Sequence, residues 1–318
     1  MAKLTDDYPG KEISVKELKK QLIKDANISE IKKAKFPTEI IDLPSQGKLY
    51  PEGHPLRTGK VEMKYMTAKE EDILTSTNLI QKGVVIDMLL RSLIIGNGEG
   101  DKFNYDDLLL GDKNAIMIAA RILGYGAEYP VELTCPKCGH KETVSVNLAE
   151  LENKDVKIQE GNLFEFELPL SKKVIEFRLL THADEEKIQN ETKRMKKKSL
   201  SNQISFDLTS RLKQLIVSVD GEDSRKAIND FVENEFISRD SLAFRNYIEE
   251  VSPDVDMTVY HECSECGADS TVQIPMTVDF FWPRVWLQAR STPADIPAYL
   301  SRERWVYSQW CLWNAYIP

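Results

Sequence analysis

Four cysteines of the chain fall in two matching pairs that could bind a metal ion. Residues 135–139 read Cys-Pro-Lys-Cys-Gly, and residues 263–267 read Cys-Ser-Glu-Cys-Gly. Glycine after the second cysteine permits a tight turn in which both sulfur atoms of a pair face one point. Two such turns supply four soft ligands, which is the ligand set of a closed tetrahedral zinc site. The predicted ligands of one structural Zn²⁺ per chain are Cys135, Cys138, Cys263 and Cys266.

A zinc ion held by four thiolates serves structure rather than catalysis, because it has no open position for a reactive water. Two alternatives remain for the same cysteines, a redox centre and metal-free buried thiols, while a disulfide framework is disfavoured in a reducing compartment. His140 and His261 adjoin the pairs, and we expect both outside the ligand shell. The fifth cysteine, Cys311, lies among tryptophan and leucine and is expected to pack as an apolar residue.

Each cysteine pair is predicted to form the turn of a β-hairpin. The segments on either side have the residue types and alternation of short strands. These segments are residues 130–133, 143–146, 257–260 and 270–273. Because the two pairs are far apart in the sequence, a shared zinc ion would close the long intervening segment into a loop.

Other strands and several helices are predicted in the rest of the chain. Residues 60–66 alternate as a strand does, and residues 163–168 and 174–179 flank a polar turn as a further hairpin. Thr67 and Glu70 match the capping box that begins a helix. Apolar residues at helical spacing predict helices over residues 79–93, 112–123, 181–198, 204–219, 224–235 and 238–251.

These elements indicate an α+β fold, with helical lobes and β-hairpins that carry a split four-cysteine site similar to a zinc ribbon. The length of 318 residues suggests about two domains. The predicted divisions are a solvated N-terminal arm over 1–35, a domain of loop, strand and helices over 36–128, a zinc-clipped α+β domain over 129–281 with a helical insertion over 182–252, and an aromatic C-terminal docking segment over 282–318.

Composition excludes several classes of protein. The formal charge of −9 argues against a protein that coats nucleic acid, and the basic run over 193–198 is interpreted as the solvated end of a helix. No apolar run reaches the roughly 20 residues of a membrane span, and no secretory signal is present, so we expect a cytosolic protein. No nucleophile-and-base pattern or phosphate-binding loop occurs. We therefore expect no enzymatic activity.

Aromatic residues are concentrated near the end of the chain, where all five tryptophans lie from Trp282 onward. Tryptophan and tyrosine dominate the energetics of protein interfaces. The segment is predicted either to dock on a partner or to complete the protein's own core. The aromatic residues proposed for a partner contact are Trp305, Tyr307, Trp310 and Trp313.

Several short motifs, taken in order, resemble those of the baseplate hub and hub-assembly proteins of T-even-type contractile-tailed bacteriophages. They are Leu-Pro-Ser-Gln-Gly-Lys-Leu-Tyr-Pro at 43–51, Thr-Ala-Lys-Glu-Glu-Asp at 67–72, Cys-Pro-Lys-Cys-Gly-His at 135–140, Glu-Leu-Pro at 167–169 and Phe-Arg-Leu-Leu-Thr at 177–181. The resemblance covers residues 36–290. It implies a non-enzymatic protein whose partners are other baseplate or tail proteins, or further copies of itself. It also implies presence in the host cytoplasm during assembly, and in the tail baseplate if the protein is retained.

The loop over 44–51 is a candidate contact within this region, because ordered loops often carry binding residues. Leu49 and Tyr50 are its proposed partner-binding residues, and the alternative is a loop that only leads to the first strand. A competing interpretation of the whole chain is a zinc-ribbon factor that binds nucleic acid or RNA polymerase. Steeply salt-dependent binding to DNA or RNA would distinguish that class.

Overall fold

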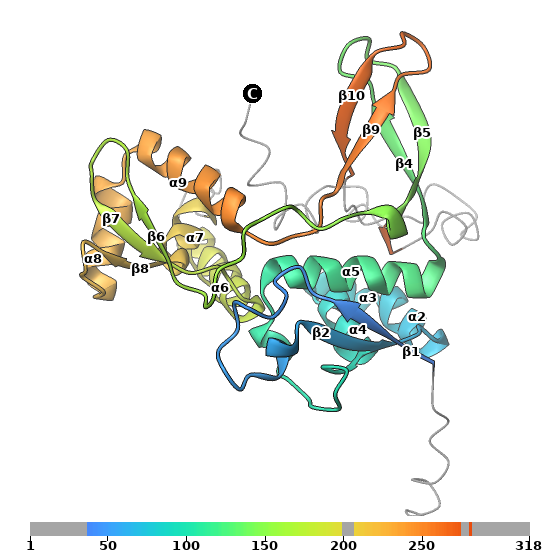
Figure 1. Cartoon of the computed structure of the whole chain (residues 1–318), viewed down its shortest axis with the longest axis horizontal. Helices are drawn as coiled ribbons and strands as arrows, with labels where there is room; N and C mark the ends of the chain where they lie inside the picture. The colour runs from blue at the N-terminus through green and yellow to red at the C-terminus, as the bar shows by residue number, and fades with distance from the viewer. Residues whose placement is uncertain (1–36, 199–206, 275–279, 282–318) are drawn as a thin grey trace, which may run out of the picture. The chain divides into compact units, whose positions relative to one another are not determined.

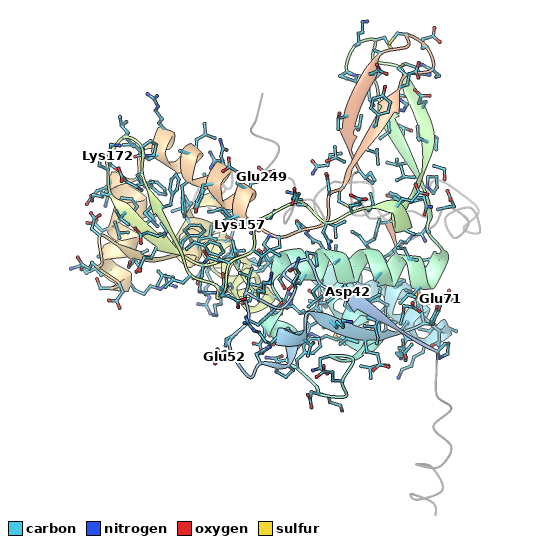
Figure 2. All side chains as sticks on the ribbon, in the orientation of Figure 1. Asp42, Glu52, Glu71, Lys157, Lys172 and Glu249 are labelled. Atoms are coloured by element: carbon cyan, nitrogen blue, oxygen red, sulfur yellow. The ribbon has the colours of Figure 1, made fainter. Side chains whose placement is uncertain are left out.

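The computed structural model describes residues 37–198, 207–274 and 280–281 (Figure 1). These residues form helices and small antiparallel sheets, which confirms the predicted mixture of helix and sheet. Charged side chains such as Asp42, Glu52 and Lys172 are exposed (Figure 2). Within the described ranges, no helix combines the length and the apolar character that crossing a membrane requires.

The first sheet has three antiparallel strands, with β2 in the centre. Its strands are β1 (Thr38–Asp42), β2 (Lys60–Lys64) and β3 (Ile94–Gly96). Val61 and Met63 alternate into the core, as the sequence pattern predicts for β2. Tyr65 follows the end of the strand and is exposed. The loop between β1 and β2 contains the short 3₁₀ helix η1 (Pro55–Thr58).

Four helices follow or pack near this sheet. They are α2 (Ala68–Thr75), α3 (Thr77–Lys82), α4 (Val85–Leu93) and α5 (Leu110–Tyr125), with the 3₁₀ helix η2 (Tyr105–Asp107) before α5. The capping box of Thr67 and Glu70 begins α2 as predicted. The prediction of a single helix over 79–93 is wrong, because α3 and α4 are separate helices. Gly83 adopts a φ of +72° and ends α3, because its N–H bonds back to the carbonyls of that helix's last turn.

Helix α5 contacts α4 and strands β1 and β2 of the first sheet, and most of its side chains are buried. Gly111, in its first turn, meets the backbone of the segment that leads to β9. A Cβ atom at Gly111 would lie 1.9 Å from the carbonyl oxygen of Pro253. Glycine is therefore required there by the close approach of two backbones.

A second group of elements combines three strands and four helices. The strands are β6 (Phe164–Glu167), β7 (Val174–Phe177) and β8 (Ile216–Val219), and the helices are α6 (His182–Lys198), α7 (Asp207–Leu215), α8 (Arg225–Asp230) and α9 (Ser238–Val251). A π-helical turn over Phe231–Glu235 follows α8. Phe177 of the sheet and Phe244 of α9 meet edge to face, with ring centroids 5.0 Å apart.

The helix predicted over 204–219 is too long, because the described part of α7 ends at Leu215 and Ile216–Val219 form β8. β8 pairs antiparallel with β7, and Ile175 faces Val219. β8 is an edge strand of this sheet, and its β-branched residues suit the largely buried position beside β7. The segment 182–252, expected to be helical, thus contributes one strand to the sheet.

The two cysteine pairs lie in the turns of two β-hairpins, as predicted. The first hairpin is β4 (Glu128–Thr134) with β5 (Lys141–Asn147), followed by the 3₁₀ helix η3 (Leu148–Glu150). The second is β9 (Thr258–Glu262) with β10 (Asp269–Gln273). The hairpins lie side by side with their cysteine turns at the same end (Figure 1).

Candidate metal centre

The two cysteine turns have nearly identical backbone hydrogen bonds. The Gly139 N–H donates to the Cys135 carbonyl at 2.9 Å, and the Gly267 N–H donates to the Cys263 carbonyl at 2.9 Å. Both glycines have positive φ, +74° and +61°. A side chain with a Cβ atom rarely adopts this conformation, so glycine makes each tight turn possible.

The four sulfur atoms converge, although they come from hairpins more than a hundred residues apart. Cys135 Sγ lies 3.7 Å from Cys266 Sγ, and Cys138 Sγ lies 3.7 Å from Cys263 Sγ. All four lie within 4.8 Å of one another. In a regular tetrahedron with zinc–sulfur bonds of about 2.3 Å, the sulfur atoms are separated by about 3.8 Å. The cluster therefore has the size that a tetrahedral zinc ion requires.

The electrostatics of the cluster also fit a cation. Backbone amides of Cys138 and Lys137 donate toward Cys135 and lower the pKa of its thiol to about 6. The amide of His140 acts to lower the pKa of Cys138, but burial and hydrogen bonds with neighbouring thiols raise it to about 12. Four thiolates at this spacing repel one another. A divalent cation among them would relieve that repulsion and stabilise the ionised form.

An interaction beside the cysteines joins the two hairpins directly. Glu142, the second residue of β5, accepts from His261 Nε2 of β9 at 2.9 Å and from the Ser264 N–H at 3.2 Å. The side chain of Ser264 acts most strongly to lower the pKa of Glu142, and the Ser264 N–H and His261 act in the same direction. His261 is thus near the cluster but hydrogen-bonded to a carboxylate. Sequence reasoning missed Glu142, because its alternating strand position carries no sign of a partner on another hairpin.

A second group of potential metal ligands consists of Asp106, His182 and Glu186. His182 is buried, and its Nδ1 lies 3.3 Å from the ammonium of Lys113. Burial and this ammonium lower the pKa of His182 to about 4. Because a cationic side chain already contacts the histidine, we do not interpret this group as a metal site.

Leu49 and Tyr50, expected at a partner surface, lie inside the protein, where 2% and 4% of their surfaces are exposed. Tyr50 donates its hydroxyl to Asp112 Oδ2 at 2.6 Å, and Asp112 also accepts from the N–H and hydroxyl of Ser45. Burial raises the pKa of Asp112. In this structure neither Leu49 nor Tyr50 has the exposure that a direct partner contact requires. The loop over 44–51 instead packs against α5.

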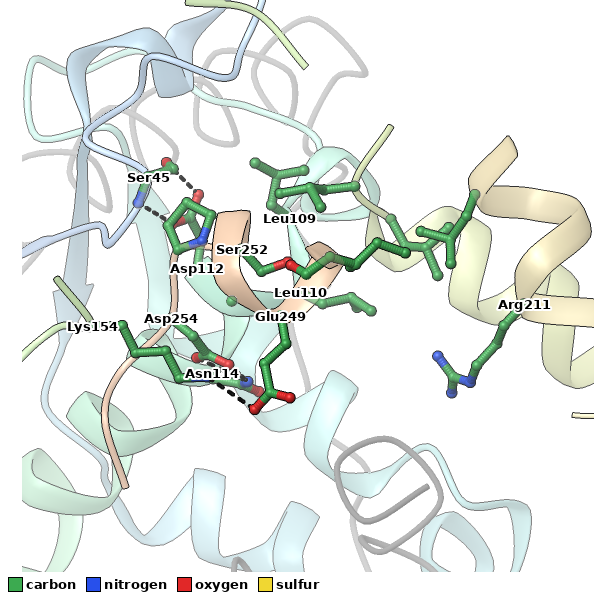
Figure 3. A pocket seen from close by; sticks show the side chains of 16 residues that line it. Ser45, Leu109, Leu110, Asp112, Asn114, Lys154, Arg211, Glu249, Ser252 and Asp254 are labelled. Carbon is green, nitrogen blue, oxygen red and sulfur yellow. Dashed lines mark hydrogen bonds and ion pairs between the residues drawn. The ribbon is translucent and has the colours of Figure 1, made fainter. Parts of the chain in front are cut away.

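A cavity of about 150 Å³ lies where α5, α9 and the segment before β9 meet (Figure 3). Asn114 Nδ2 of α5 donates to both carboxylate oxygens of Asp254, each at 3.1 Å. Lys154 and Glu249 also line the cavity and form an ion pair at 3.9 Å. Burial raises the pKa of Asp254 to about 7, although Asn114 and Lys154 act in the opposite direction. The close contact of Gly111 with Pro253 lies at the same place.

Four of the residues predicted from the sequence cannot be placed, because they lie outside the described residues. They are Trp305, Tyr307, Trp310 and Trp313.

Fold and site together describe a protein of mixed helix and sheet, in which hairpins from distant parts of the sequence meet at a four-thiol cluster. Residues 34–282 match the family described as T4 bacteriophage base plate protein, and the chain belongs to that family. It is therefore a T4-type phage baseplate protein, which confirms the resemblance in the sequence motifs at the level of the baseplate. No curated protein and no solved structure matches the chain.

Proposed function

We propose that the chain is a zinc-stabilised structural or assembly protein of the baseplate hub region, and that it acts through protein–protein contacts without catalysis. The observation that carries this proposal is the convergence of Cys135 and Cys138 with Cys263 and Cys266 at tetrahedral spacing. The family match supports the baseplate setting. Hub location within the baseplate is inferred from the sequence motifs.

Zinc would act as a cross-link between the two hairpins. Cys135 and Cys266 are 131 positions apart, so the ion would tie together the two ends of a long segment that includes β6 to α9. Because four thiolates complete a tetrahedral shell, the metal would hold no reactive water.

The partners would be other baseplate or tail proteins, with self-association as a further possibility to be measured. The aromatic segment over 282–318 is the proposed docking segment, because its tryptophans have the chemistry of interface anchors. We place the protein in the host cytoplasm during assembly and in the tail baseplate if it is retained.

Co-expression with the tail proteins of the same phage tests the assembly role. The chain should co-elute with at least one of them in size-exclusion chromatography, and elemental analysis should find one zinc per chain. Cys263→Ser should lose the metal and lower the melting temperature, whereas Cys311→Ser, at the fifth cysteine, should keep both. Full metal content in Cys263→Ser would refute the shared zinc site. Failure of the chain to co-elute with any of the tail proteins would refute the assembly role.

A further inference from the structure

The two hairpins leave a hollow between them, next to the contact of Glu142 with His261. It has a volume of about 470 Å³ and is lined by residues 144–147 of β5 and 258–261 of β9. Because successive residues of a strand point to opposite faces, four consecutive lining residues mean that the edge of the strand borders the hollow. Among the described strands, β5 pairs only with β4 and β9 only with β10. Each therefore has an edge without a strand partner. We call this hollow the β5–β9 groove.

The lining of the β5–β9 groove combines apolar side chains with carboxylates that form no ion pair within the described part of the chain. Its apolar members are Leu133, Val144, Val146, Leu151 and Val259. Tyr260 also lines it, with 70% of its surface exposed. The carboxylates are Glu150, Glu152 and Asp256, and no lysine or arginine is among the described lining residues. Glu150 accepts a hydrogen bond from Asn147 Nδ2 at 2.8 Å, and Asp256 Oδ1 accepts one from the Thr258 N–H at 2.9 Å.

Two of these acidic residues are joined through their backbones. The Asp256 N–H donates to the Glu152 carbonyl at 2.8 Å, which places the two residues side by side at one end of the groove. All three acidic residues are exposed, and none forms an ion pair with another described residue. The groove therefore offers negative charge that the described part of the chain does not neutralise.

We propose that the β5–β9 groove binds an extended segment of another tail protein, one that carries lysine or arginine, by adding a strand to an open edge. This inference rests on the proposed role in assembly and specifies the surface used. Main-chain hydrogen bonds to the strand edge would supply affinity, and the basic side chains would meet Glu150, Glu152 and Asp256. Tyr260 would contribute a large apolar contact at small entropic cost.

A synthetic peptide tests the chemistry of the groove on the full-length, zinc-loaded protein. The probe is an eight-residue peptide in which lysine alternates with valine or threonine, and its control has glutamate in place of lysine. The lysine peptide should bind, with affinity that falls as salt increases, and the glutamate peptide should bind at least tenfold more weakly. Equal binding of the two peptides, or binding of neither, would overturn the proposal.

Variants locate the binding on the surface. The double variant Glu150→Gln and Glu152→Gln should bind the lysine peptide at least tenfold more weakly, because it removes charge without changing side-chain size. Glu132→Gln, on the first hairpin but paired with Lys141 and outside the groove, is the matched control and should bind normally. Unchanged binding in the double variant would place the peptide elsewhere and overturn the proposal.

Hydrogen exchange distinguishes strand addition from a loose charge contact. Bound peptide should slow exchange of backbone amides within 143–147 or 258–261 at least tenfold, and protection confined to other segments would contradict strand addition.

If the peptide binds only after removal of residues 1–36, the groove belongs to the chain's own N-terminal segment and the partner proposal fails. If the double variant still co-elutes fully with its tail partner, the groove is not the binding surface, while the assembly role remains supported.

Discussion

Glu142 of one hairpin and His261 of the other are hydrogen-bonded beside the four-cysteine cluster, with Oε1 and Nε2 2.9 Å apart. Ser264, which lies between the second pair of cysteines, donates its N–H to the same carboxylate oxygen. The two hairpins are thus joined by side chains as well as by their thiols. Interactions of this kind orient metal ligands before the metal binds.

Removal of this carboxylate should loosen the proposed zinc site without removing a ligand. We expect Glu142→Ala to bind zinc about tenfold more weakly or worse in competition with a chelator, because neighbouring hydrogen bonds typically change metal affinity by about 10- to 100-fold. The measurement is chelator competition followed by absorbance. Glu132→Ala, on the same hairpin, is the control. Equal zinc affinity of the wild type and Glu142→Ala would show that the hydrogen bonds do not support the site.

Tyr50 should contribute to stability through its hydroxyl. In Tyr50→Phe, buried Asp112 loses a donor at 2.6 Å, and the Leu109 N–H loses the hydroxyl oxygen that accepts from it. The expected loss is about 1–3 kcal/mol of unfolding free energy, measured by denaturant titration. Tyr65→Phe changes an exposed tyrosine and should cost much less. A neutral Tyr50→Phe variant that instead loses a tail partner would restore the surface role expected from the sequence.

Gly111 should tolerate no side chain. Alanine is the better helix former, yet at this position its Cβ would overlap the Pro253 carbonyl, so Gly111→Ala should destabilise the protein by about 1–3 kcal/mol. Gly124→Ala in the same helix would meet only the end of the flexible Met66 side chain and is the matched control. Thermal unfolding of both variants measures the difference. If the two behave alike, the backbone contact at Pro253 is not restrictive.

Asp254 should make stability depend on pH. Its pKa is raised from 3.8 to about 7 by burial, so the folded protein holds a proton that the unfolded chain releases. Stability from this group is therefore present below about pH 4 and is lost as the pH rises to about 7. The unfolding free energy of Asp254→Asn minus that of the wild type should therefore be larger at pH 8 than at pH 5.

Denaturant titrations at the two pH values measure this effect, and Asp155→Asn, at an exposed carboxylate nearby, is the control. A difference between variant and wild type that is the same at both pH values would contradict the raised pKa.

The aromatic C-terminal segment should be required for assembly rather than for folding. Deletion of residues 292–318 removes Trp305, Trp310 and Trp313 and should leave a folded protein that keeps zinc but no longer co-elutes with its partner. Circular dichroism, elemental analysis and chromatography measure the three properties. Unfolding of the truncated chain would show that the segment belongs to the protein's own core.

The sequence by itself determined features that depend on near neighbours. The Cys-x-x-Cys-Gly turns, the strands beside them and the capping box at Thr67 were predictable, because each depends on residues a few positions apart. The ends of two helices were not predicted correctly from the sequence. Gly83 divides one predicted helix, because it caps α3. Ile216–Val219 form a strand where a helix was predicted, because they pair with β7.

Only the tertiary structure decided which distant groups meet. It brings Glu142 to His261, Tyr50 to Asp112 and Gly111 to Pro253, and it turns a proposed surface loop into part of the core. No local pattern encodes such pairs, because they depend on how whole elements pack. The four cysteines are the exception among distant contacts, since the preference of zinc for four thiolates made the convergence of two Cys-x-x-Cys-Gly turns predictable from the sequence.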